Sequence, residues 1–352
     1  MENLFKKEDT QIVKGTAIIL MVTYHLFAYN NKVNSNIQFV FLSRNAIGYT
    51  IAYFGKICVS IYLFLSGFGL FFSYNKLGKF TFKDSIQRIK KVYIDYSIIF
   101  VIFISIELLI GLEKLNVYEL ILNILCLKFN YNNFAWFIRT YFILVLLFPL
   151  LIKIFNKNII SNVLKLGGIV ITYIFMCKFQ YIINYKDISI IGDIKLLNEI
   201  NTTLLWSIPF ILGFLCAKHN IFSYIMNIIS KYKLNQKIIY LLIICICIIV
   251  RTKAPMVLLY DALVCPIVIF AIRNIFFDLK LNKIITLLGN NSTNIWLIHF
   301  FITLKCWKFV YYPKYALLIL IWSFIIMIPI SIVLNKILNY IKYKSLKNKQ
   351  II

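Results

Sequence analysis

Charged residues are scarce in this sequence, and acidic residues are the scarcest of all. Charged residues make up 14% of the 352 residues, Asp and Glu together number only 13, and 61% of the residues are hydrophobic. A chain with so little polar surface cannot cover itself as a water-soluble globule, which excludes a soluble enzyme or a soluble binding module. The composition instead predicts an all-α, polytopic bundle of transmembrane helices.

Long apolar runs, by contrast, are abundant. A bilayer core about 30 Å thick is crossed by about 20 apolar residues in a helix, and the sequence offers roughly ten such runs. We expect transmembrane helices at 12–29, 56–74, 94–112, 134–155, 164–183, 203–217, 237–250, 255–275, 293–308 and 315–341.

Long loops are missing between these runs. No connecting segment is large enough to fold separately, so residues 1–352 are expected to form a single membrane domain without a fused soluble domain. The first apolar run is followed by no small-residue cleavage pattern, so we expect it to stay in the mature protein. No internal repeat of the transporter kind is visible, which disfavours a secondary transporter without excluding one.

The cysteines show no spacing typical of a metal site. All eight are scattered mainly through the apolar runs, and none forms a CxxC pair. Packing as small apolar side chains explains them. We therefore expect no metal and no bound cofactor.

The net charge is +25, from 38 Lys and Arg residues. Membrane topology explains this excess better than nucleic acid does, and no nucleic-acid partner is expected. If the amino terminus is cytoplasmic, the inner segments hold 24 of the 38 basic residues, so both termini are predicted to be cytoplasmic. One expected outer loop opposes this bias, because it carries Lys305, Lys308 and Lys314.

Five ionisable side chains fall inside the expected spans. They are His25, Glu107, Arg139, Asp261 and His299. A charged side chain costs about 2.5–3.5 kcal/mol or more at the bilayer centre, so such residues are expected to face the bundle interior and to serve a function. A rise of about 1.5 Å per residue places His299 near the middle of its span and the other four toward the outer side.

The chemistry of these groups leaves alternatives open. A neutral imidazole has a pKa near 6.5 and can take a proton from an alcohol, but His25 and His299 can equally be structural groups bonded to a neighbouring helix. Arg139 can stabilise an oxyanion or bind a phosphate, or it can pair with Glu107 or Asp261. Glu107 can also snorkel to the interface.

Four sequence motifs resemble those of the integral-membrane acyltransferases of acyltransferase family 3. The string KGTAIILMVTYH, residues 14–25, is similar to the family's first-helix pattern of a basic residue, ten residues and a histidine. SIYLFLSGFGL, residues 60–70, resembles the Ser-Gly-Phe/Tyr motif. AWFIRTYFILVLLFPLL, residues 135–151, resembles the Trp-Phe span, and LGNNSTNIWLIHFF, residues 288–301, resembles the late span that ends in histidine.

This resemblance implies that an acyl group, usually acetyl from cytoplasmic acetyl-CoA, is transferred to a hydroxyl of an extracytoplasmic glycan or a lipid-linked saccharide. It implies that His25 is the catalytic base and that Lys14 is its partner on the donor side. Ser66, Gly67 and Phe68 form the second motif. Trp136 and His299 match motif positions whose roles we do not assign. The sequence departs from the family pattern at Lys14, where Arg is commoner, and at Ile94, where Pro is frequent.

The spacing of Lys14 and His25 gives the resemblance a physical meaning. Eleven residues make about three helical turns, so both side chains lie on nearly the same helix face, about 16 Å apart along the axis. One face can then hold an anionic donor near the cytoplasm and a base further out. We therefore take His25, Lys14, Arg139 and Asp261 as candidate catalytic residues.

Arg88 and Lys91, in the most basic inner segment, are candidates for binding the CoA phosphates, since phosphate needs cationic donors. The alternative is that this segment only determines topology. The expected partners are an acyl-CoA donor, a glycan or lipid-linked saccharide acceptor and membrane lipid. The expected location is a bacterial cytoplasmic membrane.

Other function classes remain as alternatives. A transporter or flippase of a glycan or lipid-linked intermediate would explain ionisable residues inside the membrane, but it gives no role to the spacing of Lys14 and His25. A glycan polymerase is disfavoured because no large outer loop is visible. A receptor or structural protein has no need for five buried ionisable groups.

Overall fold

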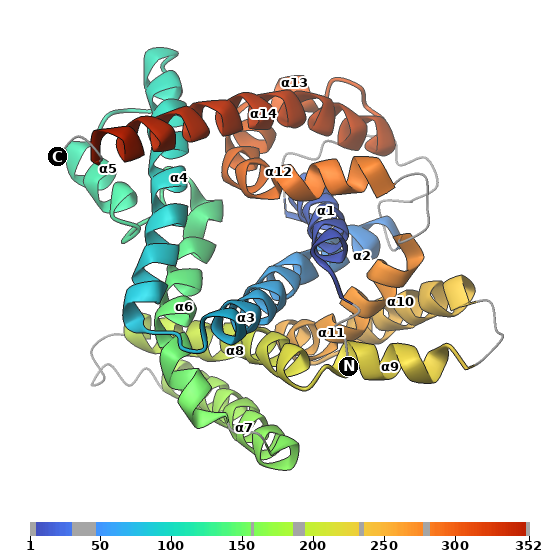
Figure 1. Ribbon diagram of the computed structural model, residues 1–352. Coiled ribbons are helices and arrows are strands. Elements are labelled where there is room, and N and C mark those ends of the chain that lie inside the picture. Colours follow the sequence, from blue (N-terminus) through green and yellow to red (C-terminus); the bar gives the residue numbers. More distant parts are fainter. Residues whose placement is uncertain are drawn as a thin grey trace. The chain divides into compact units, whose positions relative to one another are not determined.

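The computed structural model describes residues 5–29, 47–155, 158–185, 194–231, 236–276 and 282–349. Within these ranges the regular elements are helices and no β-strand element forms, which confirms the predicted all-α fold (Figure 1). The α-helices are α1 (Lys7–Tyr24), α2 (Ile47–Phe54), α3 (Cys58–Leu77), α4 (Phe82–Leu109), α5 (Val117–Ile124), α6 (Phe137–Ile154), α7 (Ile159–Tyr185), α8 (Ile194–Lys218), α9 (Ile221–Ile229), α10 (Gln236–Lys253), α11 (Val257–Phe276), α12 (Asn282–Phe300), α13 (Trp307–Val310) and α14 (Ala316–Lys349).

Four shorter helical segments connect or extend these helices. Two are 3-10 helices and two are π-helices: η1 (His25–Tyr29, π), η2 (Gly55–Ile57, 3-10), η3 (Asn133–Trp136, 3-10) and η4 (Phe301–Lys305, π).

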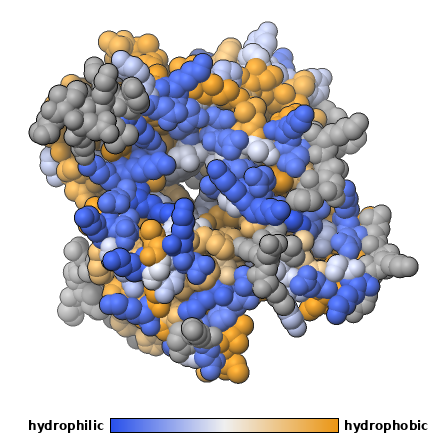
Figure 2. Space-filling view, viewed as in Figure 1, coloured by the Kyte–Doolittle hydropathy of each residue, from blue (hydrophilic) through white to orange (hydrophobic). Residues whose placement is uncertain are grey.

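Eight helices in the described ranges are long and apolar enough to cross a membrane. They cover Lys7–Ala28, Gly48–Leu77, Phe82–Leu109, Asn133–Ile154, Ile159–Tyr181, Leu197–Lys218, Val257–Phe276 and Ala316–Lys342. Large apolar side chains are exposed on their outer surfaces, with Leu164 70% and Leu317 69% exposed. Figure 2 shows such apolar residues reaching the surface beside hydrophilic ones. Lipid tails accept these side chains without cost, so the chain is an integral membrane protein.

Two expected spans, 237–250 and 293–308, form helices outside this set of eight. The first lies in α10, whose 18 residues include the basic residues Lys237, Arg251 and Lys253. The second begins in α12, which carries polar side chains at Asn290, Asn291, Ser292, Thr293 and Asn294. Their polarity distinguishes both helices from an ordinary lipid-facing span.

The chain forms two compact units built from interleaved segments. Unit 1 contains Met1–Asp9, Val59–Arg88 and Thr140–Ile275, and unit 2 contains Thr10–Cys58, Ile89–Arg139 and Phe276–Ile352. The expectation of one membrane domain stays a prediction, as does the cytoplasmic position of both termini. Three basic residues counted for that orientation, Lys157, Lys233 and Lys280, lie outside the described residues.

Unit 1 is organised around a close crossing of α3 and α8. A Cβ atom added to Gly67 would overlap the carbonyl oxygen of Phe210, and one added to Gly213 would overlap the carbonyl oxygen of Phe64. Only glycine lets two helix backbones approach so closely. Helices α7 and α8 lie side by side in the same unit (Figure 1).

Unit 2 contains a second crossing of this kind, between α1 and α12. A Cβ atom on Gly15 would overlap the carbonyl oxygen of Ile285, and one on Gly289 would overlap that of Gln11. The first long helix and a late helix are therefore in backbone contact.

Helix α12 also lies beside α14 in unit 2 (Figure 1). A buried amide network joins them: the Asn335 amide donates to Asn291 Oδ1 at 2.8 Å, and the Asn294 amide donates to Asn335 Oδ1 at 2.9 Å. Hydrogen bonds between helices hold membrane bundles together, so this network fixes α12 against α14.

Candidate active site

Two imidazole rings lie close together in unit 2. His25 follows directly after α1, and His299 is the second-last residue of α12. Their ring centroids are 4.9 Å apart, and the ring planes are inclined by 51°. His25 is half-buried, whereas His299 is fully buried, with 0% of its surface exposed. The structure thus brings together two histidines that the sequence placed in separate spans.

The ring of Phe134 packs against both imidazoles. Its centroid lies 3.8 Å from that of His25 and 4.9 Å from that of His299, with an angle of only 16° to the latter ring. Asn132 fixes this arrangement, because its amide donates to the Leu297 carbonyl at 3.3 Å and its Oδ1 accepts the Phe134 N–H at 3.2 Å. Phe134 is therefore an apolar wall of the histidine pair. No sequence pattern singles it out from the other 30 phenylalanines.

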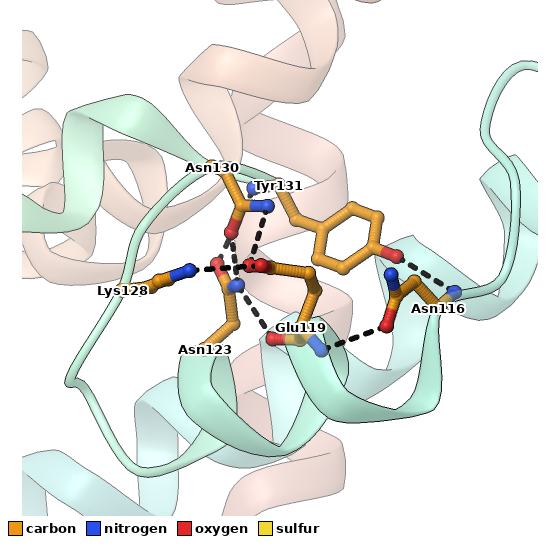
Figure 3. Close-up of polar contacts among 6 residues, drawn as sticks. All are labelled: Asn116, Glu119, Asn123, Lys128, Asn130 and Tyr131. Carbon is orange, nitrogen blue, oxygen red and sulfur yellow. Dashed lines mark hydrogen bonds and ion pairs between the residues drawn. The ribbon is translucent and has the colours of Figure 1, made fainter.

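A polar network holds the segment that leads into η3 (Figure 3). The fully buried Asn123 donates to the Glu119 carbonyl at 2.8 Å and to the side chain of Asn130, and it accepts the Tyr131 N–H at 3.3 Å. The Glu119 carboxylate accepts from Lys128 at 2.8 Å and from Asn130 at 2.9 Å. This network gives the loop between α5 and α6 a fixed course, and so positions the wall beside the imidazoles.

Each histidine is accompanied by a π-helical segment. Segment η1 begins at His25, and η4 begins at Phe301, two residues after His299. A π-turn widens a helix and is frequent at functional sites. The Tyr311 hydroxyl donates to the Leu26 carbonyl at 2.5 Å, which satisfies one backbone acceptor in η1.

Helix α1 is continuous from Lys7 to Tyr24 and carries Lys14 three turns before His25. Lys14 is half-buried and is followed directly by Gly15, the residue that contacts α12. The expected arrangement of a cation and an imidazole along one helix is therefore compatible with the structure. The role of Lys14 stays a prediction.

Lys56 is a second cation near His25, and the sequence analysis did not single it out. Its Nζ atom lies 5.9 Å from the centroid of the Tyr24 ring, whose own centroid is 5.0 Å from that of His25. In the sequence Lys56 is a single lysine at the start of an apolar run, where it resembles an ordinary residue at the membrane interface.

Trp136 and Arg139 follow Phe134 closely in the sequence, and each has contacts of its own. The Arg139 guanidinium donates to the Leu127 carbonyl at 3.4 Å and lies 5.6 Å from the Phe129 ring centroid, so it contacts the loop between α5 and α6. Trp136 ends η3, and its ring is 6.2 Å from that of Phe137. An oxyanion-binding role for Arg139 stays a prediction.

The second motif belongs to unit 1 and makes helix-packing contacts. The Ser66 hydroxyl donates to the Tyr62 carbonyl at 2.7 Å, and Gly67 forms the crossing with α8. Phe68 is buried among aromatic rings, with Phe5 at 5.1 Å and Phe222 at 6.0 Å between centroids. These contacts give the motif a packing role.

Asp261 lies in a buried ion pair in unit 1. Its two carboxylate oxygens accept from Arg251 Nε at 2.7 Å and Arg251 Nη2 at 2.8 Å, and both side chains are at most 4% exposed. Such a two-point pair joins the end of α10 to the start of α11 and neutralises both charges. The sequence analysis considered Arg139 as a partner for this carboxylate; the structure shows Arg251 instead.

Arg88 and Lys91 both lie on α4. Arg88 is half-buried and donates from Nη2 to the Ser73 hydroxyl at 2.5 Å, whereas Lys91 is exposed. Phosphate binding by these two residues stays a prediction.

Glu107 is a buried carboxyl group on α4 in unit 2. It is 4% exposed, and among the described residues neither of its oxygens has a hydrogen-bond partner. An ion pair between Lys305 and Glu113 lies in the same unit. The side chain is therefore buried and does not extend to the surface.

A comparison with protein-family models identifies the family of this chain. A family model described as an acyltransferase domain matches residues 10–336, nearly the whole chain. No curated protein and no solved structure matches the sequence. The matched range includes both imidazoles and the residues that surround them, and the chain therefore belongs to acyltransferase family 3, a family of membrane acyltransferases.

Proposed function

We propose that this membrane acyltransferase transfers an acetyl group from cytoplasmic acetyl-CoA to a hydroxyl of an extracytoplasmic glycan or a lipid-linked saccharide, with His25 as the general base. The observation that supports this proposal most directly is the half-buried imidazole of His25 next to the buried His299. The expected location is the cytoplasmic membrane of a bacterium.

In the proposed reaction, the unprotonated ring nitrogen of His25 takes the proton of the acceptor hydroxyl. The hydroxyl oxygen attacks the thioester carbonyl, and the carbon–sulfur bond breaks. The leaving thiolate takes the proton back from the imidazolium, so that an ester and free CoA thiol are formed and the base is regenerated. One residue acts first as base and then as acid, and no metal or redox partner is required.

Cationic side chains supply the binding of the donor in this proposal. Lys14, three helical turns before His25, attracts the anionic donor from the cytoplasmic side. Arg88 and Lys91 are the candidates for the CoA phosphates. Lys56 is near the Tyr24 ring that contacts His25, and its positive charge would stabilise the oxyanion of the tetrahedral intermediate.

Labelled acetyl-CoA and inverted membrane vesicles test the proposal. Wild-type vesicles are expected to move the labelled acetyl group into the glycan or lipid fraction, and His25→Ala is expected to lower this transfer by about 10²–10⁴-fold, the usual effect of losing a general base. His219→Ala is the matched control, because His219 lies in unit 1 with Nε2 3.2 Å from the Asn162 amide.

Two outcomes contradict the proposal. One is near-normal transfer by a His25→Ala variant that is inserted at the wild-type level. The other is wild-type vesicles that move an unmodified saccharide without acylating it, which would favour the transporter alternative.

A further inference from the structure

His299 has a fixed tautomer. Its Nδ1 atom lies 2.5 Å from the carbonyl oxygen of Trp296, one turn earlier in α12. Because a carbonyl oxygen only accepts, Nδ1 carries the hydrogen and donates it. In the neutral ring the other nitrogen, Nε2, is then a hydrogen-bond acceptor.

That acceptor atom is buried and has no partner among the described residues. His299 is 0% exposed, so Nε2 faces the protein interior. Buried polar atoms nearly always have a hydrogen-bond partner, so one that lacks it calls for an explanation, and a catalytic role is one such explanation. Removing water from a nitrogen lone pair without supplying a donor in its place is unfavourable.

The nearest titratable ring in the site is that of His25. The two centroids are 4.9 Å apart, and the flat ring of Phe134 covers both, so the imidazoles share one apolar enclosure. The two rings differ in burial: His25 is half-buried, whereas His299 is fully buried.

We propose that His299 is the positioning residue of this site: its Nε2 accepts an N–H hydrogen bond from His25, which leaves the other ring nitrogen of His25 unprotonated and directed at the acceptor hydroxyl. This inference rests on the proposed function. A buried group that holds a catalytic imidazole in one tautomer is the same logic as the aspartate of a serine protease. Here the orienting group is uncharged.

An uncharged orienting group suits a site inside a membrane. A carboxylate in this position would add a buried negative charge, which is unfavourable at bilayer depth. A neutral imidazole provides an acceptor without that cost. It also accepts more strongly once His25 carries the transferred proton, since a charge-assisted hydrogen bond is about twice as strong as a neutral one.

A pair of variants tests the hydrogen bond itself. His299→Phe keeps a planar ring and removes the acceptor, and it is expected to lower kcat by about 10–100-fold with little change in the KM for acetyl-CoA, as for other residues that orient a reacting group. His299→Gln keeps a side-chain carbonyl acceptor and is expected to recover part of kcat. Equal kcat values for the two variants, or a change in KM alone, would overturn the inference.

A measurement on the unaltered protein covers the case in which a variant fails to fold. The chain has three histidines, so a ¹⁵N NMR spectrum of histidine-labelled protein holds few signals. We expect His299 to be protonated at Nδ1 and unprotonated at Nε2. A His299 signal typical of a protonated Nε2 would contradict the inference, whatever the variants do.

The two proposals fail in different ways. Full activity of His25→Ala would remove the proposed function. An inactive His25→Ala beside a fully active His299→Phe would leave His25 as the base and remove only the role of His299.

Discussion

In the described part of the chain, two pairs of helices cross with a glycine on each helix, and they differ in what lies beyond the crossing. In unit 1, Gly67 and Gly213 bring α3 and α8 together among aromatic rings. In unit 2, Gly15 and Gly289 bring α1 and α12 together, and a histidine follows each glycine by ten residues.

The same contact therefore serves two purposes. At α3 and α8 it makes a packed core, whereas at α1 and α12 it also determines where two imidazoles meet, about 15 Å further along each helix. A glycine crossing is stiff because no side chain separates the backbones. That stiffness suits a site in which reacting groups must be held within a fraction of an ångström.

The largest expected effect is that of a bulky residue at the unit 1 crossing. Gly67→Leu forces a side chain into the Phe210 backbone, and the loss should exceed the roughly 1–3 kcal/mol of ordinary overpacking because a backbone cannot move aside. Yield and thermal melting of the purified protein in detergent measure it. Gly69→Leu is the matched control, since a Cβ atom added there meets nothing within 4 Å beyond the neighbouring backbone of its own helix. Similar melting of the two variants would refute the crossing.

The buried ion pair of unit 1 gives the next largest effect. Asp261→Asn removes one charge and leaves Arg251 buried, which should cost about 3–5 kcal/mol of unfolding free energy. The double variant Arg251→Met with Asp261→Leu should recover most of this stability, because an apolar pair of similar volume carries no uncompensated charge.

This experiment also tests the catalytic role first considered for Asp261. If Asp261 takes part in the reaction, the double variant will be stable but inactive. If it only pairs with Arg251, acyl transfer per folded molecule will return with stability.

Replacing glycine by alanine, a smaller change, tests whether the two crossings differ in their effect on activity. Gly289→Ala should shift α12 by a few tenths of an ångström or more and lower transfer per folded molecule by up to about 10²-fold, because small displacements of reacting groups are costly. Gly67→Ala should mainly lower the melting temperature. Transfer and melting measured on the same preparations decide the matter. A loss of specific activity in Gly67→Ala as large as in Gly289→Ala would place the second motif in the active site.

The smallest effect concerns the network of Figure 3. Lys128 is exposed, so Lys128→Ala should not measurably change the melting temperature at neutral pH. Asn123→Ala removes a fully buried polar group and should lower the melting temperature clearly. The hydrogen bond to Glu119 raises the pKa of Lys128. The small stabilising contribution of this interaction is therefore fully present at neutral pH and is lost only as the pH rises through the raised pKa. A drop in melting temperature as large for Lys128→Ala as for Asn123→Ala would contradict this prediction.

Sequence reasoning found the features that are local in the chain. Apolar length predicts the spans, and the interval from Lys14 to His25 predicts a shared helix face, because both depend only on helical geometry. The meeting of His25 with His299 and Phe134 is a tertiary contact. It depends on Gly15 and Gly289, and neither glycine differs in sequence from an ordinary helical one.

The partner of Asp261 was missed for a related reason. Arg251 stands at the end of an apolar run, where a basic residue normally faces the interface, so the sequence analysis did not consider it as a partner. In the structure it is the last turn of α10 that carries Arg251 inward to the carboxylate. Local hydropathy cannot predict a buried charge whose partner lies on the next helix.

The contact between α1 and α12 also has a consequence for biosynthesis. The helix with the proposed base is made before its counterpart with His299, and α2 to α11 lie between them in the chain. At about 5–20 residues per second, the ribosome needs on the order of 10–60 s to connect them. During that interval the nascent first helix sits in the bilayer with an unmatched glycine surface, so the insertion machinery or neighbouring lipids must cover it, and fragments truncated before α12 should have no activity.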